Sequence, residues 1–150
     1  MSIRYKLFGI PKTFNEFVDK ITKKGNNQVD VILTDYNDEE SLDGIFDHHY
    51  LMGIQAGKTK LLIKEFSYLE SENLYTNKLN KYNLKRDFLK EAVKTAEKLQ
   101  YFSLEATING FSINGTKEKI DEYDKKIAGM EQKYKNYIQN KLHSKFKDDR

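Results

Sequence analysis

The sequence predicts an α+β protein with a small antiparallel or mixed sheet. Three observations support this class: strand-like alternation in the first half of the chain, an Asn-Gly pair between short β-like runs, and two amphipathic helical patterns in the second half. At 150 residues the chain is close to the commonest domain size. We therefore expect a single α+β domain spanning residues 1–150.

The first part of the chain predicts a βαβ-like start. Residues 3–10 alternate apolar and basic side chains, as a half-buried strand does. Thr13 can cap a helix whose apolar side chains recur every three or four residues up to Ile21, before Gly25 ends the pattern. The β-branched run at 28–34 then predicts a second strand.

A hairpin and a loop are predicted in the middle of the chain. Residues 60–66 indicate a strand, while residues 44–55 fit either a strand or a helical spacing, and we favour the strand. Residues 55–58 suit the turn between them. Gly57-Lys58-Thr59 is assigned to this turn and not to a phosphate-binding loop, because Met52 stands where that motif requires its first glycine. Residues 67–82 are polar and predict a loop with a helical turn.

Two helices and a second hairpin are predicted after residue 82. The apolar spacing from Leu84 to Leu99 marks one amphipathic helix with Asn83 as its cap. Asn109-Gly110 predicts a β-hairpin between residues 103–108 and 111–113. A long C-terminal helix is predicted over 117–147, with its last few residues frayed.

This last helix carries an apolar stripe that must be covered. The candidate core or dimer residues of the stripe are Ile120, Ile127, Met130, Tyr134 and Tyr137, with Tyr123 between them. Either the predicted helix at 84–101 covers the stripe within the chain, or a second copy covers it in a homodimer. We favour cover within the chain, because a coiled coil normally needs three to four sustained heptads.

Composition excludes several kinds of chemistry. The chain has no Cys, which excludes disulfides, iron–sulfur clusters and thiol nucleophiles. No apolar run is long enough to cross a bilayer and no secretory signal is visible, so we expect a cytoplasmic protein with no membrane partner. Lys far outnumbers Arg and Asn is frequent, a bias typical of low-GC bacteria and of their phages or mobile elements.

Residues 35–47 form an acidic segment in an otherwise basic chain. It holds six acidic residues and no basic one: Asp35, Asp38, Glu39, Glu40, Asp43 and Asp47. Such a local charge can orient a partner by electrostatic complementarity, so these are the candidate partner-binding residues. The alternative is an ordinary solvated loop.

Asp47, His48 and His49 close the acidic segment. Carboxylates and imidazoles together suit Mn²⁺, Fe²⁺ or Zn²⁺, so a metal-dependent hydrolase at residues 35–49 is our weakest alternative. The triplet resembles one motif of the DHH phosphoesterases. That resemblance covers three residues, and the chain is not assigned to the family. Because neighbouring side chains of a strand point to opposite faces, we expect His48 and His49 not to share one ion, and we expect no cofactor.

The leading functional interpretation is a small non-enzymatic binding or regulatory protein that acts through protein contacts, with itself as one candidate partner. The alternative is a nucleic-acid-binding regulator that uses lysine-rich helical faces. Its candidate residues are Lys85, Lys90, Lys94, Lys98, Lys125, Lys126 and Lys133. Acidic residues are interleaved with these lysines, as they are on ordinary solvated helices.

Overall fold

The computed structural model describes residues 11–36 and 47–148 and confirms the α+β class. Its elements are α2 (Phe14–Lys23), β1 (Gln28–Tyr36), β2 (Asp47–Ala56), β3 (Thr59–Leu69), α3 (Leu74–Tyr101), β4 (Glu105–Ile108) and α4 (Ile113–Asp148). The strand expected at 3–10 lies outside the described residues, as do the acidic residues Asp38, Glu39, Glu40 and Asp43.

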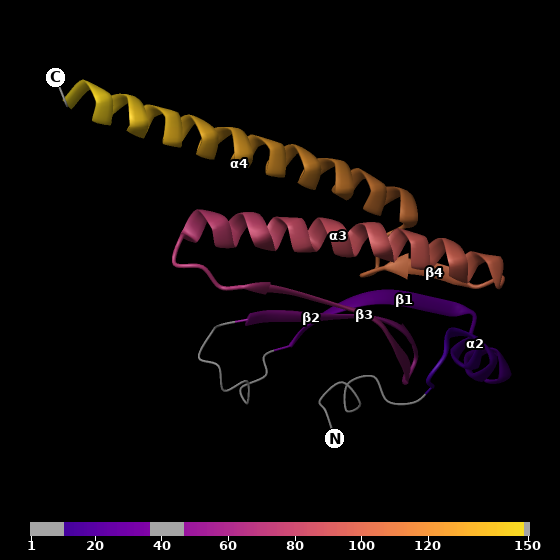
Figure 1. Cartoon of the computed structure of the whole chain (residues 1–150). Coiled ribbons are helices and arrows are strands. Elements are labelled where there is room, and N and C mark those ends of the chain that lie inside the picture. Colours follow the sequence, from indigo (N-terminus) through magenta and orange to yellow (C-terminus); the bar gives the residue numbers. More distant parts are fainter. Residues whose placement is uncertain (1–10, 37–46, 149–150) are drawn as a thin grey trace.

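The four strands form one mixed sheet in the order β3-β2-β1-β4. β2 is antiparallel to both β1 and β3, whereas β4 is parallel to β1. Figure 1 shows α3 lying along one face of this sheet and α4 running beside α3 on its outer side. The short helix α2 packs at the end of the sheet where the β2–β3 turn lies (Figure 1).

The predicted helix after Thr13 is confirmed as α2. The Thr13 hydroxyl accepts a hydrogen bond from the Glu16 backbone N–H at 3.1 Å, which satisfies one of the free N–H groups at the helix start. Phe17 and Ile21 are fully buried on the face that the spacing predicted. Gly25 follows with a φ of 75°, a conformation that glycine adopts without a steric penalty.

The predicted hairpin at residues 55–58 is also confirmed. β2 and β3 pair up to Ala56 and Thr59, and Gly57 turns the chain with a φ of 60°. The ambiguous segment at 44–55 is therefore a strand from Asp47 onward, because it pairs with both β1 and β3.

The core lies between the sheet and α3. Val31 is paired with Ile54 and with Ile108, and Ile54 is paired with Leu61, so these four side chains form one row across all four strands. On the opposite side, α3 contributes a buried stripe that includes Phe88, Ala92, Ala96 and Leu99. Burial of these two apolar faces against each other is the main stabilising contribution to the fold.

The predicted loop at 67–82 is wrong at both ends. β3 continues to Leu69 because it pairs with β2, and α3 begins at Leu74 instead of after Asn83. Asn73 is the actual cap, since its side-chain oxygen accepts hydrogen bonds from the backbone N–H groups of Tyr75 at 2.9 Å and Thr76 at 3.4 Å. The polar first turns of α3 lack the apolar periodicity that reveals a helix in a sequence.

The β-hairpin predicted around Asn109-Gly110 is confirmed only at its turn and its first residue pair. The turn exists, with φ values of 48° and 83°, but the strand expected at 111–113 is absent from the described sheet. Instead, β4 pairs in parallel with β1, and Phe111 makes only an isolated bridge with Ile108.

The chain enters α4 earlier than the sequence predicted. The helix begins at Ile113 and not at residue 117, and it extends to Asp148. Ser112 caps it, because its side-chain oxygen accepts the Gly115 N–H at 3.0 Å. Thr116, directly before the predicted start, is a buried residue inside the first turn of α4.

Candidate functional site

The first half of the α4 stripe is covered within the chain. Ile127 is only 4% exposed, and Ile120 and Tyr123 pack against the main core. α4 lies along α3 over this stretch (Figure 1), and Lys117 pairs with Glu97 across the two helices at 3.5 Å. These residues of the stripe therefore belong to the core of the monomer.

The second half of the stripe extends past the end of α3. Tyr134 stacks on Tyr75, in the first turn of α3, with ring centroids 4.9 Å apart. Beyond this pair α4 continues alone (Figure 1), and Tyr137, Ile138 and Leu142 are 58%, 40% and 52% exposed. We call Tyr134, Tyr137, Ile138 and Leu142 the outer stripe. Large apolar side chains gathered on one exposed surface are typical of interaction sites.

A second candidate is a cavity of about 180 Å³ between α3, α4 and the sheet, which we call the cationic cleft. Its apolar side is formed by Leu33, Phe88 and Leu89. Its polar side is formed by Lys85, Asn109, Lys119 and Tyr123. Apolar walls with a few converging polar groups are typical of small-ligand sites.

The electrostatics of the cationic cleft are dominated by positive charge. Burial and the charges of Lys81 and Lys126 lower the pKa of Lys85. The Lys119 ammonium lies over the Phe111 ring at 3.2 Å from its centroid. Neither Lys85 nor Lys119 forms an ion pair with any residue that the structure describes.

A third cluster of polar groups lies where β2 and β3 leave the core. The His48 ring stacks on Tyr68 with centroids 4.6 Å apart, and its Nε2 is paired with the Glu70 carboxylate. Glu70 also accepts a hydrogen bond from the Asn77 amide at 2.8 Å. Tyr50 is an electrostatic neighbour of Tyr68 in this cluster.

The chemistry of this cluster favours a structural role. Burial, followed by the neighbouring Tyr50 and Glu70, raises the pKa of Tyr68 to about 12. Burial and the charge of Asp35 likewise raise the pKa of Tyr50. Both phenols are therefore neutral near pH 7, and a neutral phenol is a poor base and a poor nucleophile.

Of the predicted metal ligands, the structure describes the side chains of Asp35, His48 and His49. His48 and His49 are neighbours in β2 and so point to opposite faces of the sheet, as the sequence predicted for a strand. Asp35 lies near the end of β1, opposite Tyr50. Within the residues that the structure describes, no group of three or more His, Asp or Glu side chains could hold a metal ion.

The lysines predicted to bind nucleic acid lie on α3 and α4 and differ in their neighbours. Lys85 and Lys126 are electrostatic neighbours beside the cationic cleft. Lys94 pairs with Glu91 at 3.8 Å, and the Lys98 ammonium lies 4.3 Å from the Phe14 ring centroid. The other three, Lys90, Lys125 and Lys133, are exposed on their helices.

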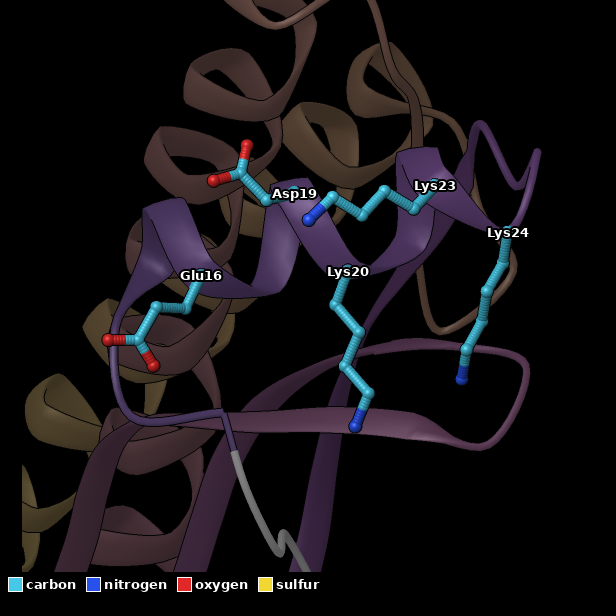
Figure 2. A pocket seen from close by; sticks show the side chains of 5 residues that line it. All are labelled: Glu16, Asp19, Lys20, Lys23 and Lys24. Carbon is cyan, nitrogen blue, oxygen red and sulfur yellow. The ribbon is translucent and has the colours of Figure 1, made fainter.

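A hollow beside α2 carries charged side chains of both signs. It is lined by Glu16, Asp19, Lys20, Lys23 and Lys24. Figure 2 shows Lys20 and Lys24 directed toward the β2–β3 hairpin, whereas Asp19 points away from it. Lys24 donates to the Thr59 hydroxyl at 3.4 Å. Because these groups do not converge on one point, the hollow offers no defined binding geometry.

Comparison with known proteins identifies no relative: no family model and no curated protein matches the sequence, and no solved structure matches the fold. Among the described helices, none is both long and apolar enough to span a membrane. The class of the protein is therefore described by its fold, a mixed four-stranded sheet covered by an α3–α4 helix pair.

Several residues of the candidate sites have no clear signal in the sequence. Lys119 belongs to no sequence pattern, and Tyr123 fits only the apolar stripe of the last helix. Tyr68 and Glu70 fell in the predicted loop, so their pairing with His48 was not foreseen. The sequence carries one signal that β3 extends to these residues: its alternation continues through Phe66 and Tyr68.

Proposed function

We propose that the protein is a small non-enzymatic binding or regulatory protein that acts through protein contacts, and that the outer stripe binds a second copy of the chain. One observation carries this proposal. The apolar stripe of α4 continues without a break past the N-terminal end of α3, from Ile127, which is 4% exposed, to Leu142, which is 52% exposed.

The continuity of the stripe supports a helical partner. Up to Tyr134, α3 packs against this face of α4. Beyond Tyr134 the same face presents Tyr137, Ile138 and Leu142 at the same helical spacing. A second α4 helix can pack there as α3 does earlier. In a two-fold dimer each copy supplies and receives the same surface, so one stripe is sufficient for both halves of the interface.

Charge beside the outer stripe predicts how salt acts on such a dimer. Between Met130 and Leu142 there are three lysines, Lys133, Lys135 and Lys141, and one acidic residue, Glu131, giving a net charge of 3 − 1 = +2. Two copies brought together would repel each other through these charges, and added salt screens that repulsion. Self-association should therefore become stronger as the salt concentration rises.

The test is light scattering after size-exclusion chromatography, at protein concentrations from about 1 µM to about 1 mM. We expect a dimer that is favoured at about 1 M salt over about 0.05 M salt. The variant Ile138→Ser with Leu142→Ser should remain folded and become monomeric. The control Asn136→Ser with Asn140→Ser changes exposed residues on the opposite side of α4 and should dimerise normally.

Two results would contradict the proposal. The first is a wild-type protein that stays monomeric at every concentration and salt level. The second is a dimer that the Ile138 and Leu142 substitutions leave intact, because the interface would then lie elsewhere. The sign of the salt effect also separates this proposal from nucleic-acid binding, which weakens as salt rises.

A further inference from the structure

The cationic cleft is assembled from four parts of the chain that are distant in sequence. Leu33 comes from β1, Lys85 from α3, Asn109 from the turn after β4, and Lys119 and Tyr123 from α4. The cleft is separate from the outer stripe, which begins at Tyr134. Its polar groups converge on one cavity, in contrast to those of the hollow beside α2.

Positive charge in the cleft is not compensated by the described part of the protein. Lys85 is half-buried, and it has Lys81 and Lys126 as like-charged neighbours. Arg86 pairs with the nearby Asp124 at 3.5 Å, so that carboxylate already has a cationic partner. Among the acidic groups, Glu122 acts on Tyr123 and raises its pKa together with burial and Tyr82. A bound anion would relieve the repulsion among the lysines.

The aromatic side chains at the cleft indicate which chemical group would be attached to such an anion. Lys119 lines the cleft, and its ammonium group lies over the ring of Phe111 beside it. Tyr123 presents a half-buried ring 5.9 Å from the ring of Tyr82. Lysines with adjacent aromatic rings are the combination that binds a phosphate and stacks on its base.

We propose that the cationic cleft binds a phosphate-bearing ligand, with the phosphate between Lys85 and Lys119 and the base or other apolar part against Leu33 and Tyr123. Phosphate suits this place because it carries up to two negative charges and several acceptor oxygens. A cavity of about 180 Å³ has room for the phosphate and part of the attached group. The ligand is thus a single nucleotide, either free or within a single strand.

The experiment is an NMR titration of the folded, isotopically labelled chain with three probes: inorganic phosphate, AMP and a short oligothymidylate. We expect saturable shifts of the amide signals of Lys85, Asn109 and Lys119. The variant Lys85→Gln with Lys119→Gln should weaken AMP binding by at least about tenfold. The control Lys90→Gln with Lys125→Gln removes the same charge from exposed positions on the same two helices and should leave it within about twofold.

Each outcome decides the proposal. AMP binding that is lost only in the cleft variant supports it and identifies a free nucleotide, while oligothymidylate binding with the same pattern and no AMP binding identifies a strand. An equal loss in the cleft variant and the control overturns it, since general charge would then be responsible. No saturable shift with any probe up to about 10 mM also overturns it. Binding of inorganic phosphate as tight as AMP overturns the placement of the apolar part.

Discussion

Two isoleucines on α4 lie in different environments, one in the core of the monomer and one in the proposed interface. Ile127 is 4% exposed beneath α3, whereas Ile138, about three helical turns further on, is 40% exposed on the outer stripe. Replacing Ile127 by Ala removes three buried carbon atoms. At about 0.8 kcal/mol for each, the lost transfer free energy is about 2.4 kcal/mol. The cavity left behind increases the cost to about 2.5–4 kcal/mol.

The same change at Ile138 should cost less than about 0.5 kcal/mol in the monomer, because its side chain is already partly in water. Urea unfolding at a protein concentration low enough to keep the chain monomeric measures both values. The thermal midpoint of Ile127→Ala should fall by about 5–16 °C. Equal costs for the two variants would refute the reasoning, because α3 would then not be what covers Ile127.

Three further predictions concern stability. Asn73→Ala removes the cap that accepts from Tyr75 and Thr76, so it should lower the free energy of unfolding by about 1 kcal/mol. Asn73→Ser should retain most of the stability that the cap contributes, and equal losses in the two variants would contradict the cap. Tyr75→Phe should raise the free energy of unfolding by about 1 kcal/mol, because the Tyr75 hydroxyl is buried without a hydrogen-bond partner among the described residues; a loss on urea unfolding would show that the hydroxyl is bonded. Tyr68 keeps its proton in the folded state up to a pKa of about 12, while in the unfolded chain it ionises near 10.0, so folding stability should fall as the pH rises between these values. In Tyr68→Phe that fall should be shallower than in the wild type, as compared by unfolding at about pH 9 and about pH 11, and an unchanged slope would contradict the raised pKa.

The elements predicted correctly are those with signals contained in a few neighbouring residues. Thr13 caps α2 through the N–H three residues later, and Gly57 turns the β2–β3 hairpin by its own conformation. The predictions that failed are the loop at 67–82, the strand at 111–113 and the helix start at 117, where local patterns were weak or tertiary contacts outweighed them. Asn109-Gly110 does turn the chain, but β4 pairs in parallel with β1. The Asp30 carboxylate on β1 stabilises this arrangement, since it accepts from the Thr107 hydroxyl at 2.7 Å and the Gly110 N–H at 3.0 Å.

The candidate sites also combine features that the sequence predicts with features that only the tertiary structure shows. The apolar stripe of α4 was visible in the sequence because its spacing follows the helical repeat. The sequence does not show where the cover of this stripe ends. That point depends on α3 beginning at Leu74 and on Tyr75 reaching Tyr134. For the same reason the predicted lysine faces contained Lys85 and Lys126 but could not show that they are neighbours.

The sequence by itself determined the α+β class, the α2 cap, the β2–β3 turn and the amphipathic character of α4. Periodicity and turn chemistry are local properties, and they identify which face of an element must be buried. The tertiary structure alone decided what covers each face. The parallel partner of β4, the boundary between the covered and outer parts of the α4 stripe, and the meeting of Lys85 with Lys119 all join residues distant in sequence, so no local pattern could encode them.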